Sequence, residues 1–313
     1  FCSSLNGKPA ELYEPLKYIL SLGGKRMRPL LSLLACDLFD GNVSDALNPA
    51  LGIELFHNFS LIHDDIMDNA PLRRNKPTVH QKWNSNIAIL SGDAMLVKAY
   101  ELISASGCDP GRKIEVLKIF NETALKVCEG QQLDMNYEKL PSVAIAQYIK
   151  MVELKTAALL GGALKMGAVI GGARPEDADR MYEFGKNIGI AFQLQDDILD
   201  VYADEGKFGK QKGGDIIANK KTFLLLKSIE LAKLNPYKKE ELQQWIYAPS
   251  FDPQQKVEAV TAIYDFLNVR KLANEEVAGY YNKGIELFNE LPCDESKKKN
   301  VLNLVESLIN REG

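Results

Sequence analysis

The sequence predicts an all-α protein, a single large helical bundle whose one domain spans residues 1–313. Apolar residues recur at helical spacing in almost every segment. Alternating runs of Val, Ile and Thr bounded by turn residues, which are typical of strands, do not recur. Hydrophobic residues make up 46% of the chain, enough for a substantial core, and no Pro- or Ser-rich linker divides it.

The first helices have clear boundary signals. Pro29 suits the first turn of a helix that ends near Asp40. Pro49 predicts the start of the next helix, which continues to Asp68 and is ended by Pro71. Further helices are expected at residues 86–106, 112–134, 142–172, 176–203 and 219–234, and three or four shorter amphipathic helices at 238–311.

Composition and charge exclude several classes of protein. The net charge of −4 provides no basic surface for nucleic acid. The five cysteines are scattered without metal or redox spacing, which predicts reduced thiols and a cytoplasmic location. The longest apolar run near the N-terminus, Leu30–Phe39, contains Asp37 and is too short to span a bilayer. No signal peptide is visible, so we do not expect a membrane protein.

Two acidic pentads lie within strongly apolar runs, Asp64-Asp65-Ile66-Met67-Asp68 and Asp196-Asp197-Ile198-Leu199-Asp200. On a helix the first and fifth aspartates share a face, and the second flanks them. Carboxylates packed so densely in apolar surroundings repel each other, so a cation must offset their cost. Carboxylate ligands favour Mg²⁺, which binds one or two carboxylates plus phosphate oxygens and water. A solvated acidic face explains one such pentad better than it explains two.

Basic residues follow the first pentad and interrupt a later helix. Arg73 and Arg74 stand just beyond the predicted end of the first acidic helix. Lys155 and Thr156 lie in an otherwise apolar helix, where a lysine beside a hydroxyl makes a good phosphate contact. Both pairs can neutralise a diphosphate that Mg²⁺ bridges to the aspartates. A surface arginine pair and a lysine extending along a helix edge are the alternatives.

The segment after the second pentad, Gly206–Asp215, contains four glycines and three lysines, Lys210 among them. This composition indicates a loop that faces phosphate, although a plain surface loop has the same composition. Lys220 then lies where a helix is expected to open, and backbone N–H groups at that position favour anions.

A separate basic turn precedes Pro29 and contains Lys25 and Arg28. It indicates a second anion site, with a helix-capping turn as the alternative. His57 lies two turns before Asp64 on nearly the same helix face, so it can assist that second site. A histidine at the edge of the core is the more common explanation for a lone histidine.

Together these motifs resemble the trans-isoprenyl diphosphate synthases, the polyprenyl synthetase family. The resemblance covers about residues 23–222 and rests on the order of G-G-K-R-M-R-P, D-D-I-M-D with R-R, G-D-A-M-L (Gly92–Leu96), E-G-Q (Glu129–Gln131), K-T, F-Q-L-Q-D-D-I-L-D and N-K-K-T. It implies one prenyl synthase domain, an all-α bundle around a deep apolar central cavity, usually as a homodimer. It also implies 1′-4 condensation of isopentenyl diphosphate with dimethylallyl, geranyl or farnesyl diphosphate, with three Mg²⁺ ions per site that Mn²⁺ can replace.

The resemblance assigns roles by motif. It implies Mg²⁺ binding by Asp64, Asp68 and Asp196, supported by Asp65, Asp197 and Asp200. It implies allylic-diphosphate contacts from Arg73, Lys155, Thr156, Gln193, Lys210 and Lys220, and an isopentenyl diphosphate site of Lys25, Arg28, His57 and Arg74. The expected catalytic residues are Asp64, Asp68, Arg73, Lys155, Asp196 and Lys210, which with Mg²⁺ stabilise charge on the departing diphosphate. The released diphosphate is expected to accept the proton, which explains why the motifs contain no dedicated general base.

Product length is expected to depend on Phe59, five residues before Asp64. A large ring there forms the floor of the growing chain's tunnel, and the resemblance links an aromatic residue here with short products. Ser60 stands where animal and fungal farnesyl synthases often have a second aromatic residue, and the first motif lacks the two-residue insertion of bacterial farnesyl synthases. We therefore expect geranylgeranyl diphosphate (C20), with farnesyl diphosphate (C15) next. Phe56 is either part of the floor or ordinary core.

Other classes of protein share parts of this pattern. A terpene cyclase takes no isopentenyl diphosphate, and the intact basic turn and second complete pentad argue against it. The same features disfavour a head-to-head, squalene-type enzyme. A non-catalytic subunit of a heteromeric prenyl synthase would have lost aspartates, yet all six are present. We predict a chain-elongating prenyltransferase and keep the cyclase and the non-catalytic subunit as alternatives.

Overall fold

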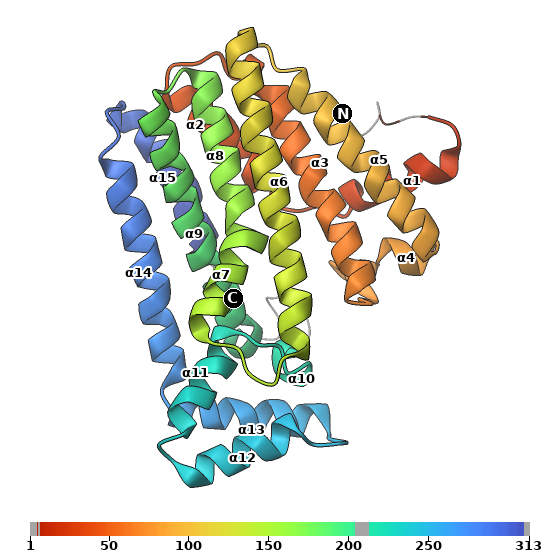
Figure 1. The fold of residues 1–313 in the computed structure, drawn as a ribbon, viewed down its shortest axis with the longest axis vertical. Helices are drawn as coiled ribbons and strands as arrows, with labels where there is room; N and C mark the ends of the chain where they lie inside the picture. Colours follow the sequence, from red (N-terminus) through yellow and green to blue (C-terminus); the bar gives the residue numbers. More distant parts are fainter. Residues whose placement is uncertain (1–4, 6, 204–212, 310–313) are drawn as a thin grey trace. The chain divides into compact units, whose positions relative to one another are not determined.

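The computed structural model describes residues 5, 7–203 and 213–309, and most of them are helical (Figure 1). The prediction of an all-α fold is confirmed. Within the described residues the strands are β1 (Leu72–Arg73) and β2 (Lys76–Pro77), which pair antiparallel with Arg73 opposite Lys76. This short hairpin, which the periodicity did not predict, carries the arginine pair that follows the first pentad.

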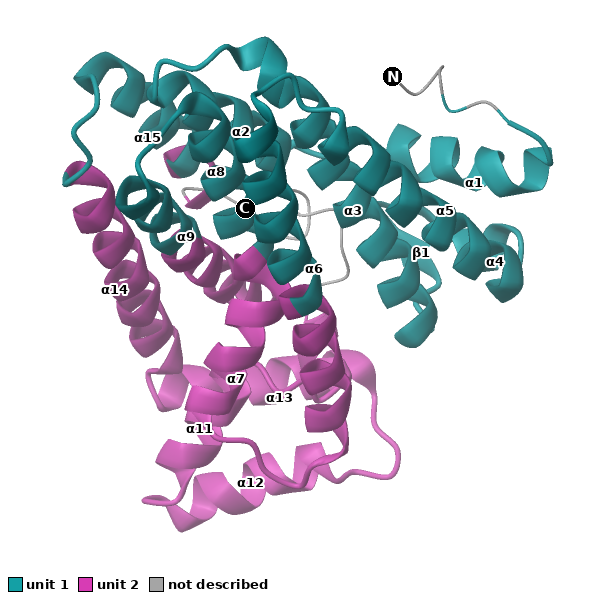
Figure 2. Cartoon of the chain, turned by 45° about the horizontal axis from the view of Figure 1, so that its top comes forward, with its two compact units in different colours: residues 1–125, 159–185, 290–305 teal, residues 126–158, 186–289, 306–313 magenta. Residues whose placement is uncertain are grey.

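Contacts along the chain divide it into two compact units (Figure 2). Unit 1 comprises residues 1–125, 159–185 and 290–305, and unit 2 comprises residues 126–158, 186–289 and 306–313. The first acidic pentad belongs to unit 1 and the second to unit 2, so each is described within its own unit. The single domain expected for residues 1–313 stays a prediction.

Unit 1 is organised around the helix that carries the first pentad. Its elements are α1 (Ala10–Ser21), α2 (Met27–Leu38), α3 (Val43–Met67), α4 (Val79–Lys82), α5 (Ser85–Ser104) and parts of α6 (Pro110–Lys139), α8 (Ala158–Gly171), α9 (Pro175–Tyr202) and α15 (Glu295–Ile309). Helix α3 packs chiefly against α5 and α2. A Cβ atom at Gly52 would lie 2.6 Å from Ile103 Cγ1, so this glycine permits the close approach of α3 and α5.

The start of α3 differs from the sequence prediction, which placed it at Pro49. The helix begins at Val43 because the Asn42 side chain accepts a hydrogen bond from Ser44 N at 3.2 Å and caps the N-terminus. Pro49 therefore lies inside the helix. The C-terminal boundary agrees better, since α3 ends at Met67 and Asp68 is its capping residue.

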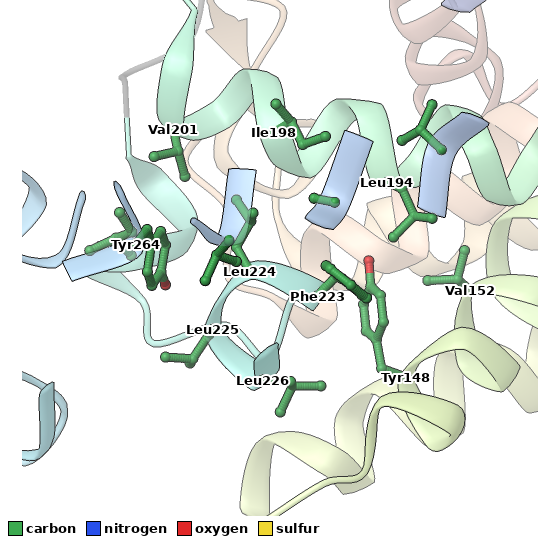
Figure 3. Close-up of a cluster of buried hydrophobic side chains, with 14 of the residues drawn as sticks. Tyr148, Val152, Leu194, Ile198, Val201, Phe223, Leu224, Leu225, Leu226 and Tyr264 are labelled. Carbon is green, nitrogen blue, oxygen red and sulfur yellow. The ribbon is translucent and has the colours of Figure 1, made fainter. Parts of the chain in front are cut away.

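Unit 2 surrounds an apolar core contributed mainly by α9 and α11. Its complete elements are α7 (Ile145–Val152), the π-helix η2 (Glu153–Ala157), α10 (Gly214–Ile217), α11 (Phe223–Ala232), α12 (Pro236–Ile246), α13 (Pro253–Phe266) and α14 (Val269–Asn289). Figure 3 shows Leu194, Ile198 and Val201 of α9 near Phe223 and Leu224 of α11. With α15, the part of the tail that the structure describes contains four helices, which agrees with the three or four expected.

The long helix predicted for residues 142–172 is divided into α7, η2 and α8. Together the segment Ile145–Gly171 is long and apolar enough to cross a membrane by length and composition. However, 78% of its most apolar window is buried inside the fold. Such burial is typical of a core helix in a soluble protein.

Candidate active site

The first pentad lies at the C-terminal end of α3. Asp64 is partly buried and Asp65 is buried, at 2% exposure. Asp68 is exposed, and its backbone N–H donates to Asp64 O at 2.9 Å, which continues the helical hydrogen-bond pattern to that residue. The three carboxylates therefore differ in environment although they share one short motif.

Arg73 binds the buried aspartate of this pentad. Its Nε donates to Asp65 Oδ2 at 2.8 Å and its Nη2 donates to Asp65 Oδ1 at 2.7 Å. The same Nη2 lies 3.7 Å from Asp64 Oδ2. The pKa of Asp65 is raised, because the effect of burial outweighs the hydrogen bonds from Arg73, which lower it. The two-pronged contact fixes both side chains, so Arg73 is held beside Asp64.

The residues expected to bind isopentenyl diphosphate come together in unit 1. Arg28 Nη1 lies 3.3 Å from His57 Nε2, and Arg74 Nη1 donates to the carbonyl oxygen of Gly23. Gly24, at φ +125°, permits this arrangement because a Cβ atom there would lie 2.9 Å from Arg74 Nη2. Lys25 stands exposed on the same turn.

Sequence reasoning missed the pair that supports this turn. Arg26, in the left-handed region at φ 50°, donates to the buried carboxylate of Glu54 and, through Nη2, to Leu20 O at 2.6 Å. Asn58 Nδ2 donates to the same carboxylate at 2.9 Å. Because Glu54 precedes His57 by less than one helical turn, the pair ties the basic turn to the part of α3 that carries His57.

The electrostatic surroundings of His57 favour its neutral form. The pKa of His57 is lowered well below 6.5, chiefly because the ring is buried. Four guanidinium groups add to the effect: Arg28, Arg73, Arg74 and Arg26. A neutral ring can accept a hydrogen bond from Arg28, so the arginines remain the positive groups available to an anion.

Aromatic rings extend from the pentad into the core of unit 1. Phe59 is partly buried, and its ring centroid lies 5.5 Å from that of Phe56. Phe56 is buried and packs edge-on against Phe120 of α6 at 5.3 Å. Ser60 directs its hydroxyl to the carbonyl oxygen of His57 at 2.8 Å. Phe56 is thus a fixed base beneath Phe59, while Ser60 contributes no ring.

In unit 2 the second aspartate of the second pentad is also buried, since Asp197 is 3% exposed. It accepts hydrogen bonds from the Tyr148 hydroxyl and from Gln193 Nε2, the latter at 3.0 Å. Figure 3 shows the Tyr148 hydroxyl pointing toward α9. Burial, followed by repulsion from Asp215, raises the pKa of Asp197 to about 7.

The predicted Lys-Thr pair lies on the π-helical turn η2. Lys155 Nζ lies 2.5 Å from Asp134 Oδ2, and Thr156 Oγ1 donates to Gln193 Oε1 at 3.2 Å. Gly130 of the E-G-Q motif packs against this turn, where a Cβ atom would lie only 2.2 Å from Lys155 N. The glycine of the E-G-Q motif is therefore needed for steric reasons. π-helical turns such as η2 often occur at functional sites.

The remaining acidic and basic residues of unit 2 surround α10. Asp196 and Asp200 are partly exposed, and Asp200 Oδ2 accepts a hydrogen bond from Asp215 N at 3.0 Å. Lys220 is 45% exposed, and its Nζ lies 3.8 Å from Asp215 Oδ1. Helix α11 begins at Phe223 rather than near residue 219, so Lys220 lies on the preceding connection. Lys210 lies outside the described residues.

Two lysines near this connection are structural. Lys221 Nζ donates to the carbonyl oxygens of Tyr137 and Glu138, at 2.7 and 3.0 Å, in the last turn of α6. The fully buried Lys256 donates to Asn219 Oδ1 at 2.7 Å and lies 4.0 Å from the centre of the Phe251 ring. The neighbours Lys220 and Lys221 therefore make different contacts.

Comparisons with known proteins show which family the chain belongs to. Residues 9–264 match the polyprenyl synthetase family. The chain belongs to the polyprenyl synthetase family. It is 37% identical over 307 residues to the geranylgeranyl diphosphate synthase of Methanosarcina mazei, covering 97% of this chain and 91% of that protein. The prediction of a short-chain trans-isoprenyl diphosphate synthase, and hence of a prenyltransferase, is confirmed.

Solved structures of such synthases have the same fold. A crystal structure of a geranylgeranyl pyrophosphate synthase is 41% identical, with a TM-score of 0.93, and covers 99% of this chain and 95% of that one. The geranylgeranyl pyrophosphate synthetase of Pyrococcus horikoshii is 34% identical, with a TM-score of 0.91, covering 98% and 92% respectively. The likeness therefore extends well beyond the motif-bearing region.

The donor set of this prenyl synthase fits Mg²⁺. Among residues 5, 7–203 and 213–309, no three His, Cys, Asp or Glu side chains converge as a metal site. Mg²⁺ needs no such cage, because it binds one or two carboxylates and takes its other ligands from water and phosphate. The accessible carboxylates of Asp64, Asp68, Asp196 and Asp200 offer oxygen ligands of that kind.

Proposed function

We propose that this prenyl synthase condenses isopentenyl diphosphate with dimethylallyl, geranyl and farnesyl diphosphates and releases geranylgeranyl diphosphate (C20). The position of Phe59 carries the proposal. Its ring lies on the pentad helix and is backed by the buried Phe56, which in turn packs on Phe120. A chain that grows away from Asp64 along α3 meets this stack of rings.

The described residues supply positive charge and orientation for two diphosphates. The allylic diphosphate is assigned to Arg73, Lys155, Thr156, Gln193 and Lys220. Lys210 is assigned to the same task by motif. Arg73 and Lys155 are each fixed by an aspartate, at 2.7 Å from Asp65 and 2.5 Å from Asp134. Fixed cations stabilise charge that develops on a leaving group without having to reorganise.

The second diphosphate is assigned to the basic turn that precedes Pro29 and to its neighbours. We assign isopentenyl diphosphate to Lys25, Arg28, His57 and Arg74, which lie together in unit 1. The neutral ring of His57 holds the Arg28 guanidinium, and the Arg26–Glu54 pair holds the turn. Separate positive sites for the two substrates distinguish an elongating enzyme from a cyclase, which binds one diphosphate.

Mg²⁺ ions would be held by Asp64, Asp68 and Asp196, with Asp200 in support, and would neutralise charge on the allylic diphosphate. We propose three ions per site, with Mn²⁺ as a substitute. Asp65 and Asp197 are better suited to positioning, because protein groups already occupy their carboxylates.

The reaction balances without a dedicated base. The allylic C1–O bond breaks, which leaves an allylic cation and a diphosphate anion. The isopentenyl double bond attacks the cation, a carbon–carbon bond forms, and a proton from the adjacent carbon passes to the released diphosphate. The apolar rings of Phe59 and Phe56 keep water from the cation.

Farnesyl diphosphate (C15) is the second candidate. The contact of Phe56 with Phe59 favours it, because two rings in contact leave less length for the chain than one. The small Ser60 favours C20, since no second ring projects from the neighbouring position.

We further propose a homodimer formed through α5 and α6. Leu90 and Val97 on α5 and Ile114 and Leu125 on α6 are each more than half exposed. Residues seven or eleven apart share one helix face, so each pair forms a stripe. The Tyr100 hydroxyl donates to Asn121 Oδ1 of α6 at 3.0 Å, so the two helices approach each other at this point, which supports an interface that uses both stripes. Charged substitutions at Val97 and Leu125 should give monomers in analytical ultracentrifugation.

The whole chain is proposed to act as one catalytic domain in the cytoplasm. The four cysteines that the structure describes are free thiols. Reduced thiols are typical of that compartment. Measuring activity in soluble and membrane fractions of cells that express the full chain tests the location.

A product assay tests the proposed function. Purified protein is incubated with Mg²⁺, labelled isopentenyl diphosphate and each of the C5, C10 and C15 primers, and chain lengths are read after dephosphorylation. All three primers should give C20. A stop at C15 would favour the second candidate. Absence of incorporation by folded protein would contradict elongation and favour the cyclase or the non-catalytic subunit.

A further inference from the structure

The residue immediately before the first pentad contacts the proposed chain-length residue. His63 follows Phe59 by one helical turn, and residues four apart on a helix are neighbours. Their ring centroids lie 4.7 Å apart with an interplanar angle of 62°, an edge-on arrangement. Such aromatic contacts favour particular ring orientations beyond simple burial. The orientation of Phe59 is therefore restricted by His63 as well as by Phe56.

Helix α5 holds the other side of the His63 ring. His63 Nε2 lies 3.2 Å from the carbonyl oxygen of Ile89, which only an N–H at that position can satisfy. The ring also occupies the space that a side chain at Gly92 would need. A Cβ atom at Gly92 would lie 2.3 Å from His63 Nε2 and 2.6 Å from Cδ2. The glycine of the G-D-A-M-L motif thus makes room for the His63 ring.

We propose that His63 is a positioning residue that sets product length by holding the Phe59 ring across the path of the growing chain. The proposal rests on the proposed function, because it assumes that Phe59 ends chain growth. The His63 ring is fixed between α5 and Phe59 through the carbonyl of Ile89 and the space at Gly92. Its task is therefore steric, distinct from those of the neighbouring aspartates.

The aromatic stack explains why this support is needed. Phe56 is fully buried, whereas Phe59 is only partly buried, so the fold encloses the Phe59 ring less completely. Loss of the His63 ring would remove one of the two ring contacts that Phe59 makes with other described residues. A ring that can turn aside would let the chain accept a further five-carbon unit.

Measuring product ratios tests the proposal independently of rate. Purified wild type, His63→Ala and Phe59→Ala proteins are given farnesyl diphosphate and labelled isopentenyl diphosphate. For His63→Ala, the ratio of the next longer product to the main product should rise about three- to tenfold over wild type, the range expected for losing one aromatic contact. Phe59→Ala should lengthen the product at least as much. Thermal melting confirms that each variant is folded.

Gly92→Ala provides a second route to the same side chain. The added methyl group meets the end of the His63 ring, which can move without disturbing the backbone. The substitution should change the product ratio when His63 is present and leave it unchanged in the His63→Ala background. Gly279→Ala is the matched control, because a Cβ atom there meets nothing within 4 Å, and its product ratio should equal that of wild type.

The outcomes separate the two claims. If wild type incorporates no isopentenyl unit, or if Phe59→Ala leaves the product unchanged, the proposed function or its chain-length residue is wrong. If Phe59→Ala lengthens the product but His63→Ala does not, His63 has no role in product length. An effect of Gly92→Ala that persists without His63 would also overturn the proposal, since the glycine would then act on another group.

Discussion

Arg73 binds Asp65 through two parallel hydrogen bonds, with Nε at 2.8 Å from Oδ2 and Nη2 at 2.7 Å from Oδ1. In unit 2 the corresponding aspartate, Asp197, is also buried and held by protein side chains. It accepts hydrogen bonds from Tyr148 and Gln193 instead of from an arginine. In each pentad the second aspartate is directed into the protein. We infer that it anchors the helix end, so that the first and fifth aspartates can bind metal.

This anchoring makes Arg73→Lys a severe change despite the retained charge. Lysine cannot form the two-pronged contact, so Asp65 loses one hydrogen bond and the cation beside Asp64 is no longer fixed. We expect kcat to fall about 100-fold, which corresponds to one misplaced contact at the reacting group. Steady-state kinetics measure this. Arg180→Lys, which changes an arginine bound to Asp177 at 3.4 Å, is the control. Equal kcat values for both variants would contradict the assignment.

Gly130→Ala should disrupt the turn that carries Lys155. The added Cβ would lie 2.2 Å from Lys155 N and 2.6 Å from its Cα, so backbone rather than a flexible side chain must move. We expect a loss of about 1–3 kcal/mol in the free energy of unfolding, as for other overpacked sites. The KM for the allylic substrate should rise as well.

Gly279→Ala again serves as the comparison for Gly130→Ala. It lies on the exposed face of α14, where alanine should stabilise the helix by up to about 1 kcal/mol. Chemical denaturation and allylic KM are measured for both variants. A Gly130→Ala protein as stable and active as the Gly279→Ala protein would show that η2 tolerates the added atom.

Two adjacent lysines should respond differently to removal. Lys221 donates to two carbonyl oxygens at the end of α6, so Lys221→Ala should cost about 1–3 kcal/mol of stability. Lys220 is 45% exposed and assigned to the diphosphate, so Lys220→Ala should change stability by less than about 0.5 kcal/mol.

Kinetics provide the second half of this comparison. Lys220→Ala should raise the allylic KM about tenfold, as expected for the loss of one charge-assisted phosphate contact. Lys221→Ala should leave that KM near the wild-type value at a temperature where the variant is folded. If Lys221→Ala raised the allylic KM and Lys220→Ala lowered stability, the structural and diphosphate-binding assignments of the two lysines would be exchanged.

Acid should destabilise the protein through His57. Its pKa in the folded state is well below 6.5 because the ring is buried and surrounded by arginines. As pH falls below about 6.5, the unfolded state takes up a proton that the folded state does not, so stability decreases. This contribution is fully present above pH 6.5. Denaturation midpoints at pH 7.5 and 5.5 should differ less for His57→Gln than for wild type. Equal differences would show that His57 binds its proton normally.

Much of the fold could be predicted from the sequence because helical periodicity is a local property. The bundle, the four C-terminal helices and the end of α3 near Asp68 all agree with it. The start of α3 was wrong because Asn42 caps the helix earlier than Pro49 indicated. The π-helical turn at Lys155 was not predicted, since one extra residue in a turn barely changes the apolar pattern.

The candidate site was predicted by residue type, whereas its supporting partners were not. Tyr148 is 49 positions from Asp197, and Asp134 is 21 positions from Lys155. Such pairs depend on how helices pack, and a lone tyrosine or aspartate carries no signal of its partner. Glu129–Gln131 did carry a signal, but its steric meaning required the position of the η2 backbone.

Primer extension at the product limit tests whether Phe59 and Phe56 end chain growth at C20. Purified protein with Mg²⁺ and labelled isopentenyl diphosphate is given farnesyl diphosphate in one reaction and geranylgeranyl diphosphate in another. We expect the C15 primer to gain one five-carbon unit and the C20 primer to gain none, because Phe59 and Phe56 end the path. Extension of the C20 primer to C25 or beyond, or no extension of the C15 primer, would contradict it.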